Sequence, residues 1–276
     1  MAPANAKPWF TRRIMNAAEL WIADNNLIID LFQKLTVEVS RIEGLDRNSW
    51  YLIFSNHQSW TDIIILQRIF TRRIPLLKFF IKQELIWVPL IGIAWWILDF
   101  PIMKRYSREQ LKRHPELMGK DLDATRRSCE KFKFTPVSIL NFLEGTRFTE
   151  AKHDYQQSPF EHLLKPKGGG AAMVLRSMGD QIDKVIDITI IYPEGVPGFF
   201  DFLSGRISRV IVEAQQLDVP AQLQAGDYET DREFKTRFQA WITELWKDKD
   251  KRLQNHYDGT ANGQTIEHQR EPSSSL

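Results

Sequence analysis

Short apolar runs that end beside polar residues alternate with helical patterns along this chain, and this alternation constrains the fold more than any other feature. The strand-like runs are uniformly apolar or alternate apolar with polar residues: 37–42, 50–54, 137–143, 186–192 and 207–213. Helices are expected between and after them, over residues 59–70, 108–133, 168–178 and 231–246. The pattern predicts an α/β sandwich with a largely parallel mixed sheet flanked by helices.

A chain of 276 residues can bury one large core. We expect an amphipathic helical arm over residues 1–35, one catalytic domain over 36–254, and a disordered tail over 255–276, since the last residues are polar and contain serine and glycine. The beginning of the chain lacks the pattern of a secretory signal peptide, so export is not indicated.

The predicted arm is too acidic to favour a membrane span, because Glu19, Asp24 and Asp30 interrupt it. An amphipathic helix fits better. Its apolar residues fall roughly on one face: Ile14, Ala18, Trp21, Ile28, Phe32 and Leu35. Such a face can pack on the domain, lie on a membrane, or follow a spanning segment outside this chain.

The composition excludes some classes of protein. Apolar residues make up 43% of the chain and the formal net charge is +2, which is typical of a globular protein and disfavours nucleic acid as a partner. Cys129 is the only cysteine, so neither an internal disulfide nor a zinc site of four cysteines can form, and a reducing compartment is favoured. We expect Cys129 to be a small buried side chain in a helix.

Residues 85–98 contain no charged side chain but include Trp87, Trp95 and Trp96. Fourteen residues are too few for a helix to span a bilayer, which needs about 20. Basic residues flank the run on both sides, and tryptophans within a cationic collar favour docking on an anionic membrane surface. The alternative is a pair of core helices broken at Pro89.

Two polar motifs follow predicted strands. In the first, His57 stands at a strand end and Asp62 falls in the first turn of the next helix. An imidazole can take a proton from an attacking alcohol near neutral pH, while a carboxylate orients it and stabilises the imidazolium. A purely structural histidine is the alternative.

In the second motif, residues 144–147 place a glycine, a hydroxyl and a guanidinium at a strand end, which suits a phosphate-bearing ligand. Here the alternative is an ion pair between Glu144 and Arg147 at the edge of the sheet. The three glycines at 168–170 can serve either close approach of a phosphate or backbone, or a flexible hinge.

The two motifs together, His-x-x-x-x-Asp and then Phe-Leu-Glu-Gly-Thr-Arg about eighty residues later, resemble the lysophospholipid and glycerolipid acyltransferase family, which includes 1-acylglycerol-3-phosphate acyltransferase. The longer sequence of residues 144–153 is most similar to a branch with bacterial inner-membrane enzymes and some eukaryotic lysophosphatidate acyltransferases. The likeness covers residues 36–215.

The resemblance implies a role for each matching position. His57 matches the general base and Asp62 its orienting carboxylate, while Glu144, Gly145, Thr146 and Arg147 match the motif that binds the phosphate of the acceptor. Lys104 and Arg105 lie where the family has a further basic block, without the aromatic residue that many members carry. Residues 186–193 match the fourth family block only loosely, which leaves contacts with the acyl donor unassigned.

The resemblance further implies transfer of a fatty acyl group from acyl-CoA or acyl carrier protein to the free hydroxyl of 1-acyl-sn-glycerol-3-phosphate, giving phosphatidic acid. No metal or resident cofactor is expected, since no ligand spacing such as His-Glu-x-x-His occurs. The expected location is the cytoplasmic face of a bacterial inner membrane, peripheral or anchored by an N-terminal segment. A different lipid acceptor, a hydrolase and a non-catalytic membrane adaptor are the alternatives.

Overall fold

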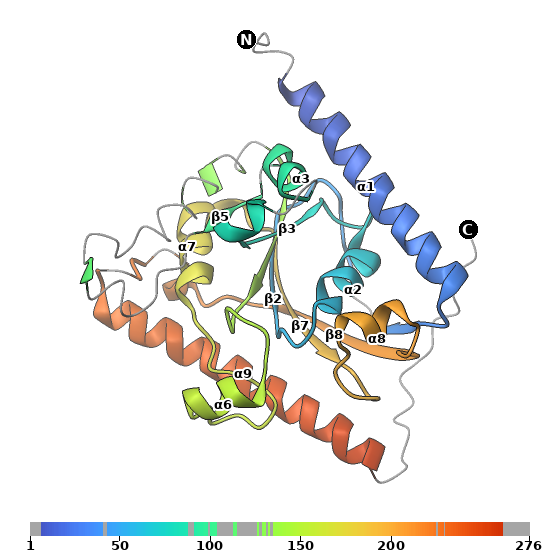
Figure 1. Ribbon diagram of the computed structural model, residues 1–276. Helices are drawn as coiled ribbons and strands as arrows, with labels where there is room; N and C mark the ends of the chain where they lie inside the picture. The colour runs from blue at the N-terminus through green and yellow to red at the C-terminus, as the bar shows by residue number, and fades with distance from the viewer. Residues whose placement is uncertain are drawn as a thin grey trace.

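A six-stranded mixed sheet forms the centre of the molecule (Figure 1). The computed structural model describes residues 7–40, 43–87, 91–98, 100–103, 113, 114, 126, 129, 130, 132, 135–224, 226–228 and 230–261. The strands in chain order are β1 (Thr36–Val39), β2 (Tyr51–Ser55), β3 (Leu77–Phe79), β6 (Ser138–Phe142), β7 (Lys184–Ile191) and β8 (Arg209–Leu217). Their order across the sheet is β1-β8-β7-β2-β6-β3.

All neighbouring strands of this sheet run parallel except β7 and β8, so the predicted fold class is confirmed. Every residue of β2 is buried, as expected for a strand whose two faces are both covered. A separate two-stranded sheet pairs β4 (Ile81–Lys82) with β5 (Ile102–Met103).

Helices cover both faces of the sheet (Figure 1). One core cluster contains side chains of α7 (Gly169–Met178) and α9 (Arg232–Ala261). The other contains side chains of α2 (Thr61–Phe70), α1 (Lys7–Phe32) and α8 (Phe199–Leu203). The remaining short helices are η2 (Gln83–Trp87), α3 (Ile91–Ile97), α6 (Glu150–Gln156), η4 (Gly179–Gln181) and η5 (Ala221–Leu223). Cys129 lies buried in the first cluster, as predicted.

Helix α1 is attached to the domain by its polar residues as well as by Ile22 and Ile29, which are buried. The Arg47 guanidinium contacts both carboxylate oxygens of Glu19, at 2.8 and 2.7 Å. Asp30 forms an ion pair with Arg68 of α2. Two of the three acidic residues that interrupt the apolar pattern of the arm, Glu19 and Asp30, therefore fix it to the domain.

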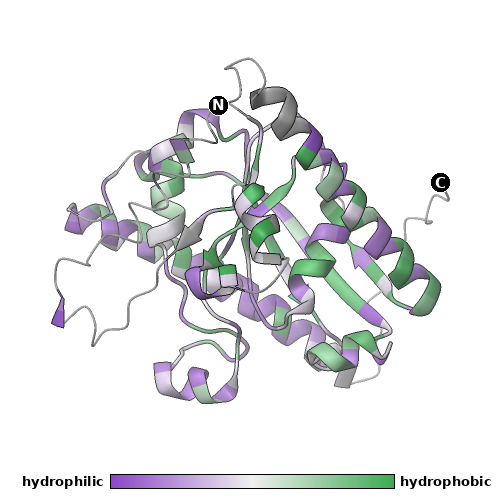
Figure 2. Cartoon of the chain, turned by 45° about the horizontal axis from the view of Figure 1, so that its top comes forward, coloured by the Kyte–Doolittle hydropathy of each residue, from purple (hydrophilic) through white to green (hydrophobic). Residues whose placement is uncertain are grey.

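Part of the apolar face predicted for this arm is turned away from the domain: Trp21, Ile28 and Phe32 are exposed, whereas Leu35 packs against the core. Figure 2 shows apolar residues on the C-terminal turns of α1. Among the helices that the structure describes, none is long and apolar enough to cross a membrane.

The last helix runs to Ala261, so the predicted helix end at 246 and the predicted disorder of residues 255–261 are wrong. Residues 247–252 are all charged, and the sequence therefore suggests that they are exposed to water. A narrow stripe nevertheless packs inward at helical spacing, formed by Trp246, Lys249, Leu253 and Tyr257. Because Lys249 is part of that stripe, the stripe cannot be recognised as apolar from the sequence.

Lys249 is fully buried, and polar groups around its ammonium compensate the charge. Its Nζ lies 2.7 Å from Asp187 Oδ1, donates to the carbonyl oxygen of Ile188, and is 3.2 Å from Thr189 Oγ1. Arg252 binds the other oxygen of Asp187 at 2.7 Å. Burial lowers the pKa of Lys249 to about 8. This cluster joins α9 to the central strand β7.

We expect Lys249→Met to lower the free energy of unfolding by about 3 kcal/mol, because it leaves a buried carboxylate without one of its two cations. Urea denaturation measures the effect. Lys247→Met on the same helix is the control, since Lys247 is exposed and pairs only with Glu244, and it should change stability by less than about 0.5 kcal/mol. Equal stability of the two variants would show that the buried cluster contributes nothing to the fold.

Candidate active site

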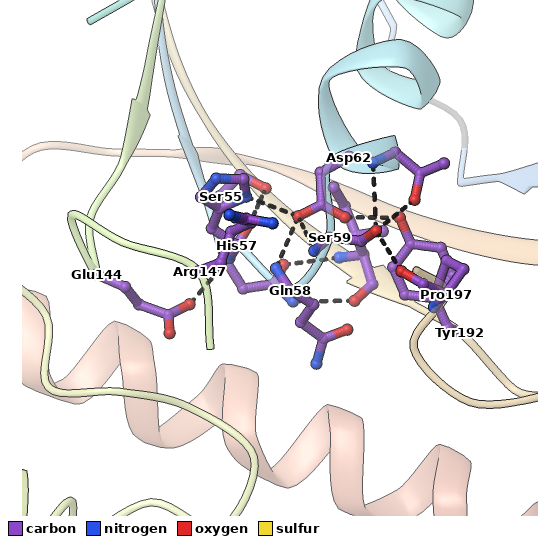
Figure 3. A network of polar contacts seen from close by, with 12 residues as sticks. Ser55, His57, Gln58, Ser59, Asp62, Glu144, Arg147, Tyr192 and Pro197 are labelled. Carbon is purple, nitrogen blue, oxygen red and sulfur yellow. Dashed lines mark hydrogen bonds and ion pairs between the residues drawn. The ribbon is translucent and has the colours of Figure 1, made fainter. Parts of the chain in front are cut away.

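The two predicted motifs meet because β2 and β6 are neighbouring parallel strands. Ser55 at the end of β2 is paired in register with Phe142 at the end of β6, so both chains leave the sheet at the same edge. The N–H of Phe148 donates to the carbonyl oxygen of His57 at 2.7 Å. Residues 87 positions apart in the sequence therefore form one site, seen in Figure 3.

His57 and Asp62 form the expected pair, with His57 Nδ1 2.8 Å from Asp62 Oδ2. The Asp62 side chain is 0% exposed and that of His57 15% exposed. An ionised carboxylate only accepts hydrogen bonds, so Nδ1 carries the proton and Nε2 keeps its lone pair. The described residues place no hydrogen-bond partner on Nε2. The geometry supplies a base that is oriented and accessible.

The imidazole is held by packing as well. The ring of His57 stacks on Phe142, with centroids 4.0 Å apart and an interplanar angle of 17°. The neighbouring Asn56 is fully buried and binds β7 twice, through its amide nitrogen to the Ile190 carbonyl oxygen and through its amide oxygen to the Ile190 N–H. The chain thus leaves β2 in a fixed direction, and the ring has little freedom to rotate.

Glu144 has contacts that the sequence did not predict, while its predicted contact with the substrate stays a prediction. Its side chain is fully buried, and its two oxygens accept the N–H of His57 at 2.9 Å and the N–H of Leu164 at 3.0 Å. Burial raises the pKa of Glu144 to about 8, against the effect of those two donors. Because both oxygens are buried and already accept backbone N–H groups, these contacts hold the His57 segment in place.

The rest of the second motif forms a tight, braced loop. Gly145 has φ of 70°, a left-handed conformation that favours glycine. Lys152 of α6 binds both Thr146 Oγ1, at 3.0 Å, and the carbonyl oxygen of Arg147, at 2.9 Å. The sequence did not single out Lys152, although its place in the longer motif was the available signal.

The Arg147 guanidinium lies over the ring of Trp60, 4.5 Å from its centroid. Trp60 directly precedes α2, so this contact joins the loop of the second motif to the first motif. A ring face does not use the N–H donors of a guanidinium. Within the described part of the chain, Arg147 forms no ion pair with a carboxylate, and the alternative of an ion pair with Glu144 is wrong.

Two further predictions have different outcomes. Lys104 and Arg105 lie outside the described residues, so their roles stay predictions. At the triple glycine, a Cβ at Gly168 would lie 2.9 Å from the ring of Phe238, and the N–H of Gly168 donates to Gln239. These two contacts show that Gly168 permits close packing of α7 against α9.

The raised pKa of Glu144 predicts a pH dependence of stability. A carboxyl group whose folded pKa is about 8 and whose ordinary value is 4.5 stabilises the fold below pH 4.5, and that contribution is lost as the pH rises through 8. Between pH 5 and 7 the free energy of unfolding should therefore fall by up to about 1.4 kcal/mol per pH unit. Glu144→Gln should flatten this part of the curve, measured by urea denaturation.

The exposed Glu150, in the same motif, provides the control. Glu150→Gln should leave the slope of the wild type unchanged, because the Glu150 side chain is exposed and the fold does not remove it from water. The same slope in the wild type and in Glu144→Gln would contradict the assignment.

Comparisons with known proteins show which proteins this chain is similar to. The chain is 28% identical over 265 residues to lysocardiolipin acyltransferase 1 of Danio rerio, covering 91% of this chain and 62% of that protein. It is 22% identical over 295 residues to 1-acyl-sn-glycerol-3-phosphate acyltransferase epsilon of Mus musculus, covering 93% and 75%. It thus spans somewhat less than two thirds of the Danio rerio protein. Both relatives are vertebrate proteins, and the narrower likeness to a bacterial branch stays a prediction.

Among solved structures, the 1-acyl-sn-glycerophosphate acyltransferase PlsC of Thermotoga maritima is similar with a TM-score of 0.44 and 17% identity, covering 87% of this chain and 81% of that one. The acyltransferase family model matches residues 36–195, which include the His57–Asp62 pair and the loop of Arg147. Since that match spans more than half of the sequence, the chain belongs to the acyltransferase family.

Proposed function

We propose that the protein transfers a fatty acyl group from the thioester of acyl-CoA or acyl carrier protein to the free hydroxyl of 1-acyl-sn-glycerol-3-phosphate, giving phosphatidic acid. The observation that carries the proposal is the accessible base at the end of β2 beside a guanidinium at the end of β6. The relatives, whose names describe acyl transfer to lysolipids, support the reaction class.

In the proposed mechanism His57 is the base. Its Nε2 takes the proton of the acceptor hydroxyl while the oxygen attacks the thioester carbonyl, giving a tetrahedral oxyanion. Asp62, held 2.8 Å from Nδ1, stabilises the imidazolium that forms. The oxyanion collapses, the carbon–sulfur bond breaks, and Nε2–H returns the proton to the leaving thiolate. The step needs no acyl-enzyme and no resident cofactor.

Arg147 is the proposed contact for the phosphate of the acceptor. Its guanidinium is oriented by Trp60 and keeps its N–H fork available, which matches two phosphate oxygens. Any phosphate-bearing lysolipid offers this group, and the Danio rerio relative is named for lysocardiolipin. We therefore keep a different lysophospholipid as the second candidate acceptor, to be separated from the first by comparing both acceptors in one assay.

We propose a membrane surface as the place of reaction. Large apolar side chains are exposed on α1, including Phe32 at 81%, and on α8, including Phe200 at 80%. The C-terminal ends of α1 and α8 are adjacent. Gln33 follows α1 and Gly205 follows α8, and a Cβ at Gly205 would lie 3.9 Å from Gln33 Cγ. Trp87 and Trp96 are exposed as well, whereas Trp95 packs against the core. Aromatic and aliphatic side chains of this kind suit the boundary between lipid headgroups and acyl chains.

The first test measures thiol release from oleoyl-CoA with and without lysophosphatidic acid, with lipid products identified by mass spectrometry. Release should require the acceptor, and His57→Ala should lower kcat by about 10²–10⁴-fold, because the base is lost. His256→Ala, which removes an imidazole of α9 paired with Glu213, should retain activity.

Full activity of a folded His57→Ala protein would overturn the mechanism. Free fatty acid in place of an acylated lipid would identify a hydrolase. Liposome binding without turnover of any donor and acceptor pair would identify a membrane adaptor.

A second test measures binding to liposomes of phosphatidylcholine and phosphatidylglycerol. Replacing two exposed aromatic residues by serine, as in Trp21→Ser with Phe32→Ser on α1 or Phe199→Ser with Phe200→Ser on α8, should weaken binding by about tenfold or more, because buried apolar area is lost. Tyr155→Ser is the control, since Tyr155 is an 85% exposed aromatic residue on α6. Equal weakening by all three variants would contradict the proposed surface.

A further inference from the structure

The buried carboxylate of Asp62 has two oxygens with separate sets of donors (Figure 3). Oδ2 accepts from His57 Nδ1 at 2.8 Å, from the N–H of Gln58 at 2.7 Å and from the N–H of Ser59 at 2.9 Å. All three donors belong to the same short segment. The other oxygen, Oδ1, accepts from the hydroxyl of Tyr192 at 2.6 Å.

Tyr192 reaches Asp62 from a different part of the fold. It directly follows β7, the parallel neighbour of β2 on the side opposite β6, and is 130 residues from Asp62. Its side chain is fully buried. Burial, together with the charge of Asp62, raises the pKa of Tyr192 well above its ordinary value, so the hydroxyl is a donor at neutral pH.

The four donors fix the carboxylate in one plane. Donors on Oδ2 alone would let Asp62 turn about its Cβ–Cγ bond, whereas a donor on Oδ1 from another strand prevents that rotation. Because Asp62 has no exposed surface, an Oδ1 without Tyr192 would be a buried acceptor with no hydrogen bond. The position of the acceptor for His57 Nδ1–H therefore depends on the end of β7.

Helix α9 supports this arrangement from below. The hydroxyl of Tyr257 lies near the side chain of Gln58 and the backbone of Tyr192, and both lower its pKa, whereas burial raises it. Its ring also contacts the ring of His162, with centroids 4.8 Å apart. Tyr257 belongs to the part of α9 beyond residue 254, so the last turns of the helix hold both segments that converge on Asp62.

We propose that Tyr192 is a positioning residue for the reaction: its hydroxyl holds the Asp62 carboxylate in the orientation that keeps the His57 imidazole aligned on the acceptor hydroxyl. This role rests on the proposed acyl transfer. It makes the end of β7 part of the site, together with the ends of β2 and β6. Tyr192 does not touch the reacting atoms and acts only through Asp62 and His57.

The test compares Tyr192→Phe with Tyr51→Phe. Both tyrosines are fully buried, but Tyr51 lies at the start of β2, at the edge of the sheet away from the site, and its hydroxyl is hydrogen-bonded to the backbone of Asp46. We expect Tyr192→Phe to lower kcat by about 10- to 100-fold, as for loss of one hydrogen bond to a charged group. KM for donor and acceptor should stay within about twofold in each variant, and Tyr51→Phe should keep the kcat of the wild type.

A double-mutant cycle separates positioning from general stability. In an Asp62→Asn background, Tyr192→Phe should cost less than about threefold in kcat, because the carboxylate through which Tyr192 acts is already gone. A kcat of Tyr192→Phe equal to that of the wild type would overturn the proposal. The proposal would also be overturned if Tyr192→Phe lowered kcat by the same factor in the wild-type and Asp62→Asn backgrounds.

A readout without turnover distinguishes this proposal from the proposed function. The Nδ1–H proton resonance of His57, assigned by its absence in His57→Ala, should shift in Tyr192→Phe and stay unchanged in Tyr51→Phe. An unchanged resonance in Tyr192→Phe would overturn the positioning role even in an active enzyme. If the wild type transfers no acyl group and the resonance still shifts in Tyr192→Phe, the proposed function is refuted. The hydrogen bond from Tyr192 would then still be shown to orient the pair of Asp62 and His57.

Discussion

The parallel pairing of β2 with β6 on one side and β7 on the other is the constraint on which the site depends. Parallel neighbours leave the sheet at the same edge, so the chains after all three strands are brought together. The His57–Asp62 pair follows β2, the loop that contains Arg147 follows β6, and Tyr192 follows β7. Antiparallel β8 then lies outside β7 and takes no place in this convergence.

Buried charge has to be compensated at this edge, and the compensation also orders the site. Asp62 receives four donors, Glu144 receives two backbone N–H groups, and Asp187 receives two cations from α9. In each case the cost of burying a polar group is offset by contacts from a second element. The same contacts that stabilise the carboxyl groups therefore fix the loops relative to one another.

The apolar residues of the surface have a related distribution. One face of α1 packs on the domain through few apolar side chains and two ion pairs, while its larger apolar residues point outward. Exposed apolar side chains that gather on neighbouring helices are unusual for a protein surrounded by water alone. Contact with a lipid surface or a lipid substrate would give the exposed apolar side chains of α1 and α8 a function.

Local patterns in the sequence determined the strands and helices nearest the site, the pairing of His57 with Asp62, and the acyltransferase family, because these depend on spacing within short segments. Periodicity could not determine which face of α1 is buried, since both faces carry apolar residues and only Ile22 and Ile29 meet the domain. Nor could it reveal the last turns of α9, whose inward stripe includes a charged lysine. The contacts of Glu144 and Tyr192 were decided by the tertiary structure alone, because each is a hydrogen bond between residues 87 or 130 positions apart, and only the order of strands in the sheet brings such residues together.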